Sequence, residues 1–215
     1  MVKVLKYFLF LCLGLTAVVG FSQNQSLKFE HIGTAEGLSQ INVSSIIQDS
    51  RGFMWIGTRD GLNRYDGYKF IIYNHSFQDD NTIRNNQVID IAEYREGNIW
   101  VSTSSGLNKF DRKTGRFIRF LHDDHNANTL SINSLNKLIF DAQGYLWIGT
   151  QKGGMDCLDI KKNIFKHYVH SDFDTNSISD NNISTVFVDS KHNLWVGTSS
   201  GLNLLNRKTG AFIKY

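Results

Sequence analysis

The 215-residue sequence contains no proline, only two cysteines and little charge imbalance, because 23 lysines and arginines face 20 aspartates and glutamates. Its basic residues are scattered rather than clustered, so the composition does not indicate a nucleic-acid partner. Three chemical signatures are also missing: a phosphate-binding Gly-x-Gly-x-x-Gly loop, a Gly-x-Ser-x-Gly nucleophile elbow and a Cys-x-x-Cys pair. We therefore predict no catalytic residue, no cofactor and no metal, and we expect that this chain is not an enzyme.

The first 22 residues are typical of a cleavable export signal. Lys3 and Lys6 precede an apolar run over residues 7–19, which small residues separate from a cleavage site after residue 22. That run is too short to span a membrane comfortably, so cleavage is favoured over anchoring. Losing two lysines would take the formal net charge from +3 to about +1.

The two cysteines have different expected fates. Cys12 lies in the signal segment and would be removed, which leaves Cys157 alone and unable to form an internal disulfide. Cys157 lies within a strand-like pattern, and this placement predicts a buried structural thiol.

The sequence is organised as a fourfold repeat. Every tryptophan occupies the same slot of a unit that reads [Met/Ile/Leu]-Trp-[Ile/Val]-[Gly/Ser]-Thr and recurs after 45, 47 and 48 residues. The four are Trp55, Trp100, Trp147 and Trp195. A period of this length is the signature of a repeat architecture whose units bury their faces against one another.

Each unit contains four strand-like runs separated by turn residues such as Asp, Asn and Gly, and it shows no helical apolar stripe. This pattern predicts an all-β fold, a β-propeller with four four-stranded blades over residues 43–73, 88–121, 135–169 and 183–215. Residues 27–32 resemble the fourth strand of a blade but have no first three strands before them. We predict that this segment closes the last blade of a ring that continues in residues absent from this sequence.

The units resemble the two-component regulator propeller repeat, whose signature is an Asp-x-x-Gly turn, the tryptophan motif and a Gly-Leu-[Asn/Tyr] run. The matching segments are residues 49–66, 96–111, 141–159 and 189–206. Residues 33–39 with Asn42 look like the start of the extracytoplasmic sensor region in bacterial hybrid two-component histidine kinases. Single turns depart from the signature: Ser102 replaces a glycine, and we interpret Asn193 as the replacement of a turn glycine.

The resemblance implies a seven-bladed ring in the N-terminal part of a longer protein, which would continue into a membrane helix and a histidine kinase core. It also implies a periplasmic location, with tethering to the inner membrane through that missing part. The implied function is the detection of glycan fragments and the regulation of glycan-use genes. The implied partners are an oligosaccharide, the remaining blades, the kinase region and a second copy in a homodimer.

Most repeated residues are best explained by structure. The four tryptophans are predicted to pack in the core, and Gly57, Gly149 and Gly197 to lie where blades approach closely. The His122-Asp123-Asp124-His125 run has a metal-like composition, but it lacks a third spaced ligand, so a solvated loop between blades is the favoured interpretation.

Ligand-binding candidates come from the loops that follow the second strands, because these emerge on one face of the ring together with the loops between blades. Arg59 and Asp60 in the first unit and Gln151 and Lys152 in the third are our predicted ligand-binding residues, since charged and amide groups give directional recognition.

Three alternatives remain open at this point. One is a secreted propeller enzyme, a lyase or glycosidase, whose catalytic acid or histidine would break the repeat symmetry. Another is a scaffold that binds proteins along blade edges, and the last is a truncated fragment without a function of its own.

Overall fold

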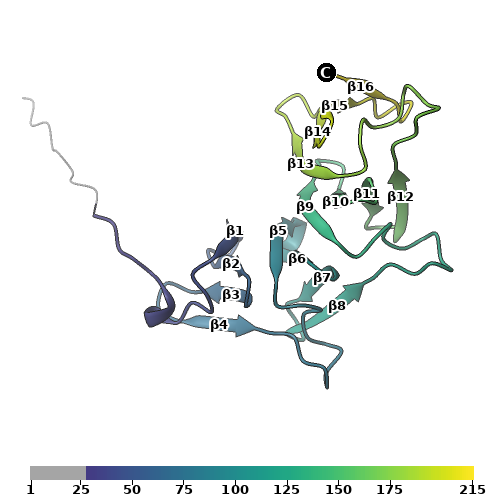
Figure 1. Ribbon diagram of the computed structural model, residues 1–215. Helices are drawn as coiled ribbons and strands as arrows, with labels where there is room; N and C mark the ends of the chain where they lie inside the picture. The colour runs from purple at the N-terminus through teal and green to yellow at the C-terminus, as the bar shows by residue number, and fades with distance from the viewer. Residues whose placement is uncertain (1–27) are drawn as a thin grey trace, which may run out of the picture. The chain divides into compact units, whose positions relative to one another are not determined.

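The computed structural model describes residues 28–215, and the signal peptide predicted for residues 1–22 lies outside them. The chain divides into two compact units at the bond between His31 and Ile32. All the blades lie in the second unit, Ile32–Tyr215 (Figure 1). In the part of the chain that the structure describes, no helix has the length and apolar character needed to cross a membrane.

The fold is all-β and consists of four four-stranded sheets, in which consecutive strands pair antiparallel. Blade 1 contains β1 (Val43–Gln48), β2 (Met54–Thr58), β3 (Gly61–Tyr65) and β4 (Phe70–Tyr73). Blade 2 contains β5 (Val88–Tyr94), β6 (Asn98–Thr103), β7 (Gly106–Asp111) and β8 (Arg116–Phe120). Blade 3 contains β9 (Leu135–Phe140), β10 (Tyr145–Thr150), β11 (Met155–Asp159) and β12 (Ile164–Tyr168). Blade 4 contains β13 (Ile183–Val188), β14 (Leu194–Thr198), β15 (Gly201–Leu205) and β16 (Phe212–Lys214).

An aspartate shapes the turn between the first and second strands of a blade. In blade 1, Asp49 Oδ1 accepts hydrogen bonds from the backbone N–H groups of Arg51 and Phe53, and Gly52 takes a positive φ of 88°. In blade 4 the residue at the glycine position is His192, with φ 64°, and not Asn193. Our assignment of Asn193 was therefore one residue out of register.

The predicted closing strand forms no strand here. Residues 28–33 have no regular structure and precede a short 3-10 turn, Thr34–Glu36. A β-strand exists only where a neighbouring strand supplies hydrogen bonds. The closing role of residues 27–32 and the seven-bladed ring both stay predictions.

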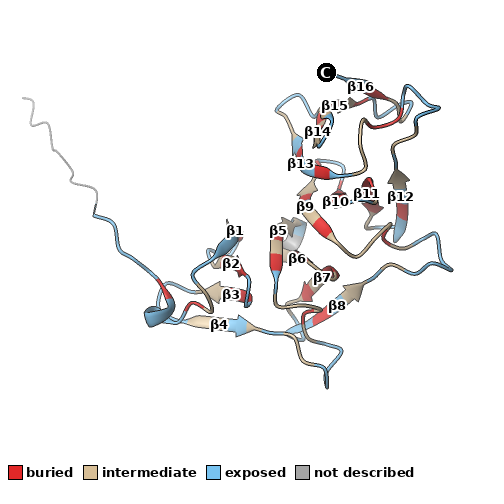
Figure 2. Cartoon of the chain, in the orientation of Figure 1, coloured by how far each residue is buried: buried red, intermediate tan, exposed pale blue. Residues whose placement is uncertain are grey.

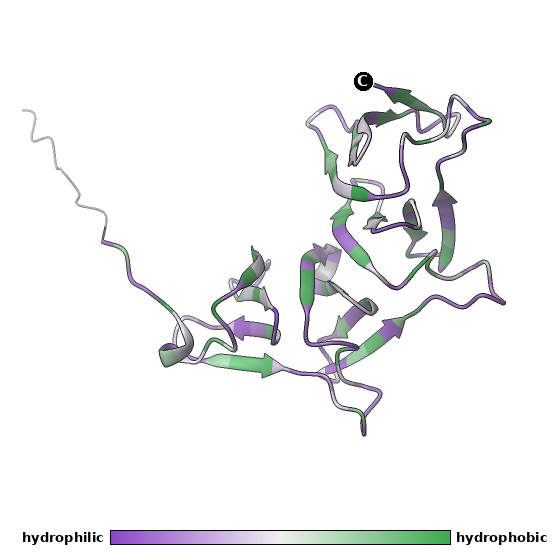
Figure 3. Cartoon of the chain, in the orientation of Figure 1, coloured by the Kyte–Doolittle hydropathy of each residue, from purple (hydrophilic) through white to green (hydrophobic). Residues whose placement is uncertain are grey.

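The blades pack face to face along the chain. The first strands of successive blades, β1, β5, β9 and β13, contact one another in that order. A separate apolar cluster fills each of the three junctions, between blades 1 and 2, 2 and 3, and 3 and 4. Figure 2 shows buried segments in β5 and β9 and exposed residues in the long loops between blades. Figure 3 shows polar residues concentrated in the turns and in those loops.

Candidate functional site

The four predicted ligand-binding residues lie in two exposed turns, Arg59 and Asp60 after β2, and Gln151 and Lys152 after β10. Each turn contacts the segment that leads into a first strand. The Asp60 carboxylate accepts a hydrogen bond from Asn86 Nδ2 (3.1 Å), and the backbone N–H of Gln151 donates to the carbonyl of Ser134 (3.0 Å). Within residues 28–215 no hydrogen bond or ion pair joins the two turns, so their shared role stays a prediction.

Three of the four tryptophans, Trp55, Trp100 and Trp147, lie at the junctions between blades, whereas Trp195 of the last blade packs against Tyr215. Trp55, Trp100 and Trp147 are buried, whereas Trp195 is half-buried. A Cβ atom on Gly57 would lie 2.5 Å from a Val88 methyl group, and one on Gly149 would lie 2.8 Å from Ile183. Both contacts reach the next blade, which explains why those two positions need glycine. A Cβ on Gly197 would instead meet Thr185 of its own blade.

An ion pair fastens blade 2 to blade 1 at the tryptophan. Trp55 Nε1 donates to Asp49 Oδ2 (2.7 Å), and Arg112 from the β7–β8 turn donates to the same oxygen (2.7 Å). We call this arrangement the clasp. Burial alone would raise the pKa of the Asp49 carboxyl, but the hydrogen bonds from Trp55, Arg112 and two backbone amides outweigh it and lower the pKa.

The clasp recurs between blades 3 and 4 and is replaced between blades 2 and 3. Asp141 accepts from Trp147 Nε1 (2.8 Å) and from Arg207 (2.5 Å) in the third and fourth blades. In blade 2 the aspartate position is Tyr94, and the arginine position in blade 3 is Ile160. Both residues pack against the apolar cluster of that junction. The indole N–H of Trp100 has no hydrogen-bond partner among the described atoms.

A carboxylate and a histidine break the repeat symmetry in blade 3. Three blades place an asparagine in the third strand, at Asn63, Asn108 and Asn203, and blade 3 places Asp156 there. The buried Asp156 accepts hydrogen bonds from His167 Nδ1 (2.7 Å) and from the backbone N–H and Oγ of Ser131. The other imidazole nitrogen of His167 contacts the carbonyl of Ala127. Since both nitrogens and both oxygens are engaged, the pair joins β11, β12 and the loop before β9.

The metal-like run is part of a repeated loop. The Nδ1 atoms of His75, His122 and His170 each contact a carbonyl oxygen eight residues further along the chain. His122 Nε2 also contacts Asp124 (2.9 Å). Among the described residues no three His, Cys, Asp or Glu side chains are grouped as metal ligands.

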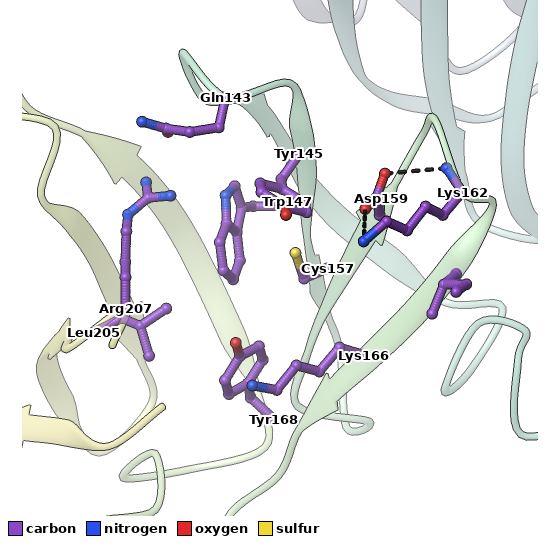
Figure 4. A pocket seen from close by; sticks show the side chains of 11 residues that line it. Gln143, Tyr145, Trp147, Cys157, Asp159, Lys162, Lys166, Tyr168, Leu205 and Arg207 are labelled. Atoms are coloured by element: carbon purple, nitrogen blue, oxygen red, sulfur yellow. Dashed lines mark hydrogen bonds and ion pairs between the residues drawn. The ribbon is translucent and has the colours of Figure 1, made fainter. Parts of the chain in front are cut away.

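A cavity of about 500 Å³ opens between blades 3 and 4. Figure 4 shows Leu205 and Arg207 of blade 4 on one side of the Trp147 indole and the Cys157 sulfur on its other side, with Tyr168 below them. The volume lies within the range of small-molecule sites. The complete lining is Gln143, Tyr145, Trp147, Cys157, Asp159, Lys162, Ile164, Lys166, Tyr168, Leu205 and Arg207.

The cavity combines aromatic walls with a basic rim. Lys166 Nζ lies 4.6 Å from the ring centroid of Tyr168, and the Arg207 guanidinium lies 5.3 Å from the indole of Trp147. The Cys157 thiol is buried, and desolvation, aided by the charge of Asp141, raises its pKa to about 12. That thiol is protonated at neutral pH, so it acts as a small apolar wall and not as a nucleophile.

Sequence reasoning missed this cavity, although a signal was available. In blades 1, 2 and 3 the tryptophan of the second strand pairs with a third-strand residue, which is Arg64, Lys109 and Cys157, respectively. Reading the repeats in register would have identified Cys157 as the one short residue at that position.

Comparisons with known proteins agree with the repeat assignment. The family described as "Two component regulator propeller" matches residues 37–60, 82–105 and 177–200. "Histidine kinase P4" of Formosa agariphila is 42% identical over 76 residues, which are 35% of this chain and 5% of that protein.

Two solved structures from B. thetaiotaomicron are each 26% identical to this chain. The extracellular domain of the protein BT3049, titled a hybrid two component system, superposes with a TM-score of 0.65 over 86% of this chain and 31% of its own length. The extracellular domain of BT4673, titled a one component system, gives a TM-score of 0.72 over 87% of this chain and 27% of its own length. This chain therefore spans less than a third of these relatives.

The likeness covers fold, repeat period and repeat sequence together. The chain is a β-propeller segment, and three of its repeats match the two-component regulator propeller family.

Proposed function

We propose that this chain is the ligand-binding propeller of a hybrid two-component sensor that operates in the periplasm. The carrying observation is that two relatives at 26% identity are extracellular domains of one- or two-component regulatory systems. The ligand is a glycan fragment, and its binding regulates genes for glycan use. The chain contributes recognition, and a histidine kinase region of the parent protein contributes the phosphoryl transfer.

The mechanism is a shift between two arrangements of a homodimeric parent. A ligand shifts such an equilibrium only by the difference between its affinities for the two states. The geometry suits this role, because a ligand held between two blades contacts two sheets at once, and its affinity depends on how far apart those sheets lie. The fold supplies such places at the junctions and on the face that carries the β2–β3 and β10–β11 turns.

A reporter assay with the full-length parent protein tests the proposal. The promoter of the genes that the parent protein regulates would be fused to a fluorescent protein, and cells would be grown on a panel of oligosaccharides. We expect induction by one glycan class and thermal stabilisation of the purified propeller by the same glycan, without its consumption. Turnover of the glycan would instead favour the secreted enzyme. Absence of induction by every glycan in the panel would count against glycan sensing.

A further inference from the structure

The residues that pair with tryptophan across a blade differ in blade 3. Blade 1 has the row Trp55, Arg64 and Ile71, and blade 2 has the row Trp100, Lys109 and Ile118. Blade 3 has the row Trp147, Cys157 and Lys166. The basic residue has moved from the third strand to the fourth, and a short residue has taken its place.

This exchange leaves aromatic surface uncovered in blade 3. In blade 1 the Arg64 guanidinium lies 4.8 Å from the ring centroid of Phe53, and in blade 2 Lys109 Nζ lies 5.7 Å from the indole of Trp100. These long side chains cover aromatic surface that the Cys157 side chain is too short to reach.

The facing blade does not compensate for the short side chain. Opposite Trp55, blade 2 presents Phe110, with 5.3 Å between the ring centroids. Opposite Trp147, the equivalent residue of blade 4 is Leu205. Two smaller residues at one junction produce the cavity of about 500 Å³.

The exchange also places a positive charge at the cavity rim. Lys166 is exposed, and none of the ion pairs formed by the described residues involves it. The neighbouring cations are already paired, Lys162 with Asp159 at 3.8 Å and Arg207 with Asp141 at 2.5 Å. The Lys166 ammonium therefore keeps its hydrogen-bond donors for a ligand.

We propose that this cavity binds an acidic saccharide, with the sugar carboxylate on Lys166 and a sugar ring against Tyr145, Trp147 and Tyr168. Aromatic walls suit the apolar face of a ring, and an unpaired ammonium suits an anion. The assignment rests on the proposed function, because it takes the ligand to be a glycan, and it adds which class of glycan and which residues bind it.

The test is calorimetric titration of the full chain with a galacturonic acid trisaccharide and with the neutral galactose trisaccharide of the same linkage. We expect the acid to bind at least about tenfold more tightly, the equivalent of about 1.4 kcal/mol for one charge-assisted contact. Lys166→Met removes the charge without filling the cavity and should remove this preference. Lys161→Met, in the β11–β12 turn and outside the cavity lining, should bind like the parent chain.

A double exchange, Cys157→Lys with Lys166→Ile, gives blade 3 the arrangement of blade 2 at unchanged net charge. Because that arrangement already folds in blade 2, we expect a folded protein with the cavity filled and binding of the acid lost. Retained binding in this variant, equal affinity for the two sugars, or no binding of the acid would each overturn the proposal.

The outcome separates this proposal from the sensor function. Loss of binding in Lys152→Met but not in Lys166→Met would place the ligand on the turn face, which overturns the cavity site and leaves the sensor intact. Induction of the reporter by neutral glycans alone would likewise support sensing and reject an acidic ligand.

Discussion

Replacing Arg112 by methionine removes the charged half of the clasp between blades 1 and 2 and keeps most of the apolar stem. Arg112 is only 11% exposed, and its guanidinium contacts the fully buried carboxylate of Asp49 and the carbonyl of Gly97. The guanidinium carbon also lies 5.8 Å from the ring centroid of Trp55. We expect Arg112→Met to weaken this junction and leave the strands of both blades intact.

The expected cost follows from the bonds that are lost. A hydrogen bond to a buried charged group contributes about 1.5–3 kcal/mol, and the bond to the Gly97 carbonyl about 1 kcal/mol. Asp49 keeps the donors of Trp55 and two backbone amides, so its charge is not left unpaired and the larger penalty of an orphaned ion does not apply. We therefore expect a loss of about 3 kcal/mol in the free energy of unfolding, or about 6–12 °C in Tm for a chain of this size.

Urea and thermal unfolding followed by tryptophan fluorescence measure this effect. Lys113→Met is the matched control, since Lys113 is the next residue of the same turn and is exposed. It should change stability by less than about 0.5 kcal/mol. If Arg112→Met were no less stable than Lys113→Met, the clasp would contribute nothing and our account of the junction would be refuted.

The pH dependence gives an independent check of the same contact. The folded pKa of Asp49 is lowered from 3.8, so its ionised form stabilises the fold above that value. The contribution is lost as the pH falls through the folded pKa. The unfolding free energies of the parent chain and Arg112→Met should consequently converge as the pH falls below 3.8.

Three further predictions concern blade 3 and its junction with blade 4. Asp156→Asn should lower the pKa of His167 in an NMR titration, because the hydrogen bond that His167 Nδ1 donates to the Asp156 carboxylate is the main cause of its raised pKa. Since that pKa is raised, the stability it contributes is present below 6.5 and lost as the pH rises through the folded value, and the variant should lose this dependence. Cys157, with a pKa of about 12, should react with a thiol reagent far more slowly in the native chain than in urea. Gly149→Ala should cost about 1–3 kcal/mol in urea unfolding, and more than Gly197→Ala, whose added methyl group meets an exposed threonine of its own blade.

The fold could be read from the sequence because its determinants are local and repeated. Each turn aspartate and its tryptophan lie six residues apart, so one unit contains the whole signal. Local chemistry also sets the ends of the strands. The fourth strand of blade 1 begins at Phe70, because Asp66 Oδ1 accepts the backbone N–H groups of Tyr68 and Lys69 in the turn before it.

The candidate site could not be read in the same way, because its determinants are distant. The cavity depends on which side chain of blade 4 faces Trp147, and Leu205 lies 58 residues further along the chain. The clasp partners Asp49 and Arg112 are likewise 63 residues apart. Nothing in a single unit indicates these pairings. Our predicted ligand residues were instead chosen by loop position and residue type, both of which are local properties.

Some departures from the repeat change two contacting residues together, and others change one residue without a compensating change in its neighbour. Between blades 2 and 3 the aspartate and the arginine of the clasp are both replaced, by Tyr94 and Ile160, and the two new side chains pack against one cluster. Such a paired change exchanges one structural contact for another. Cys157 has no compensating larger partner, because the facing residue is Leu205. Blade 3 has less side-chain packing at its junction with blade 4, and the lysine that it gains there forms no ion pair with a described residue. This change lowers stability, and no new contact within the described part of the chain offsets the loss. Binding a ligand is the function that such a change can serve.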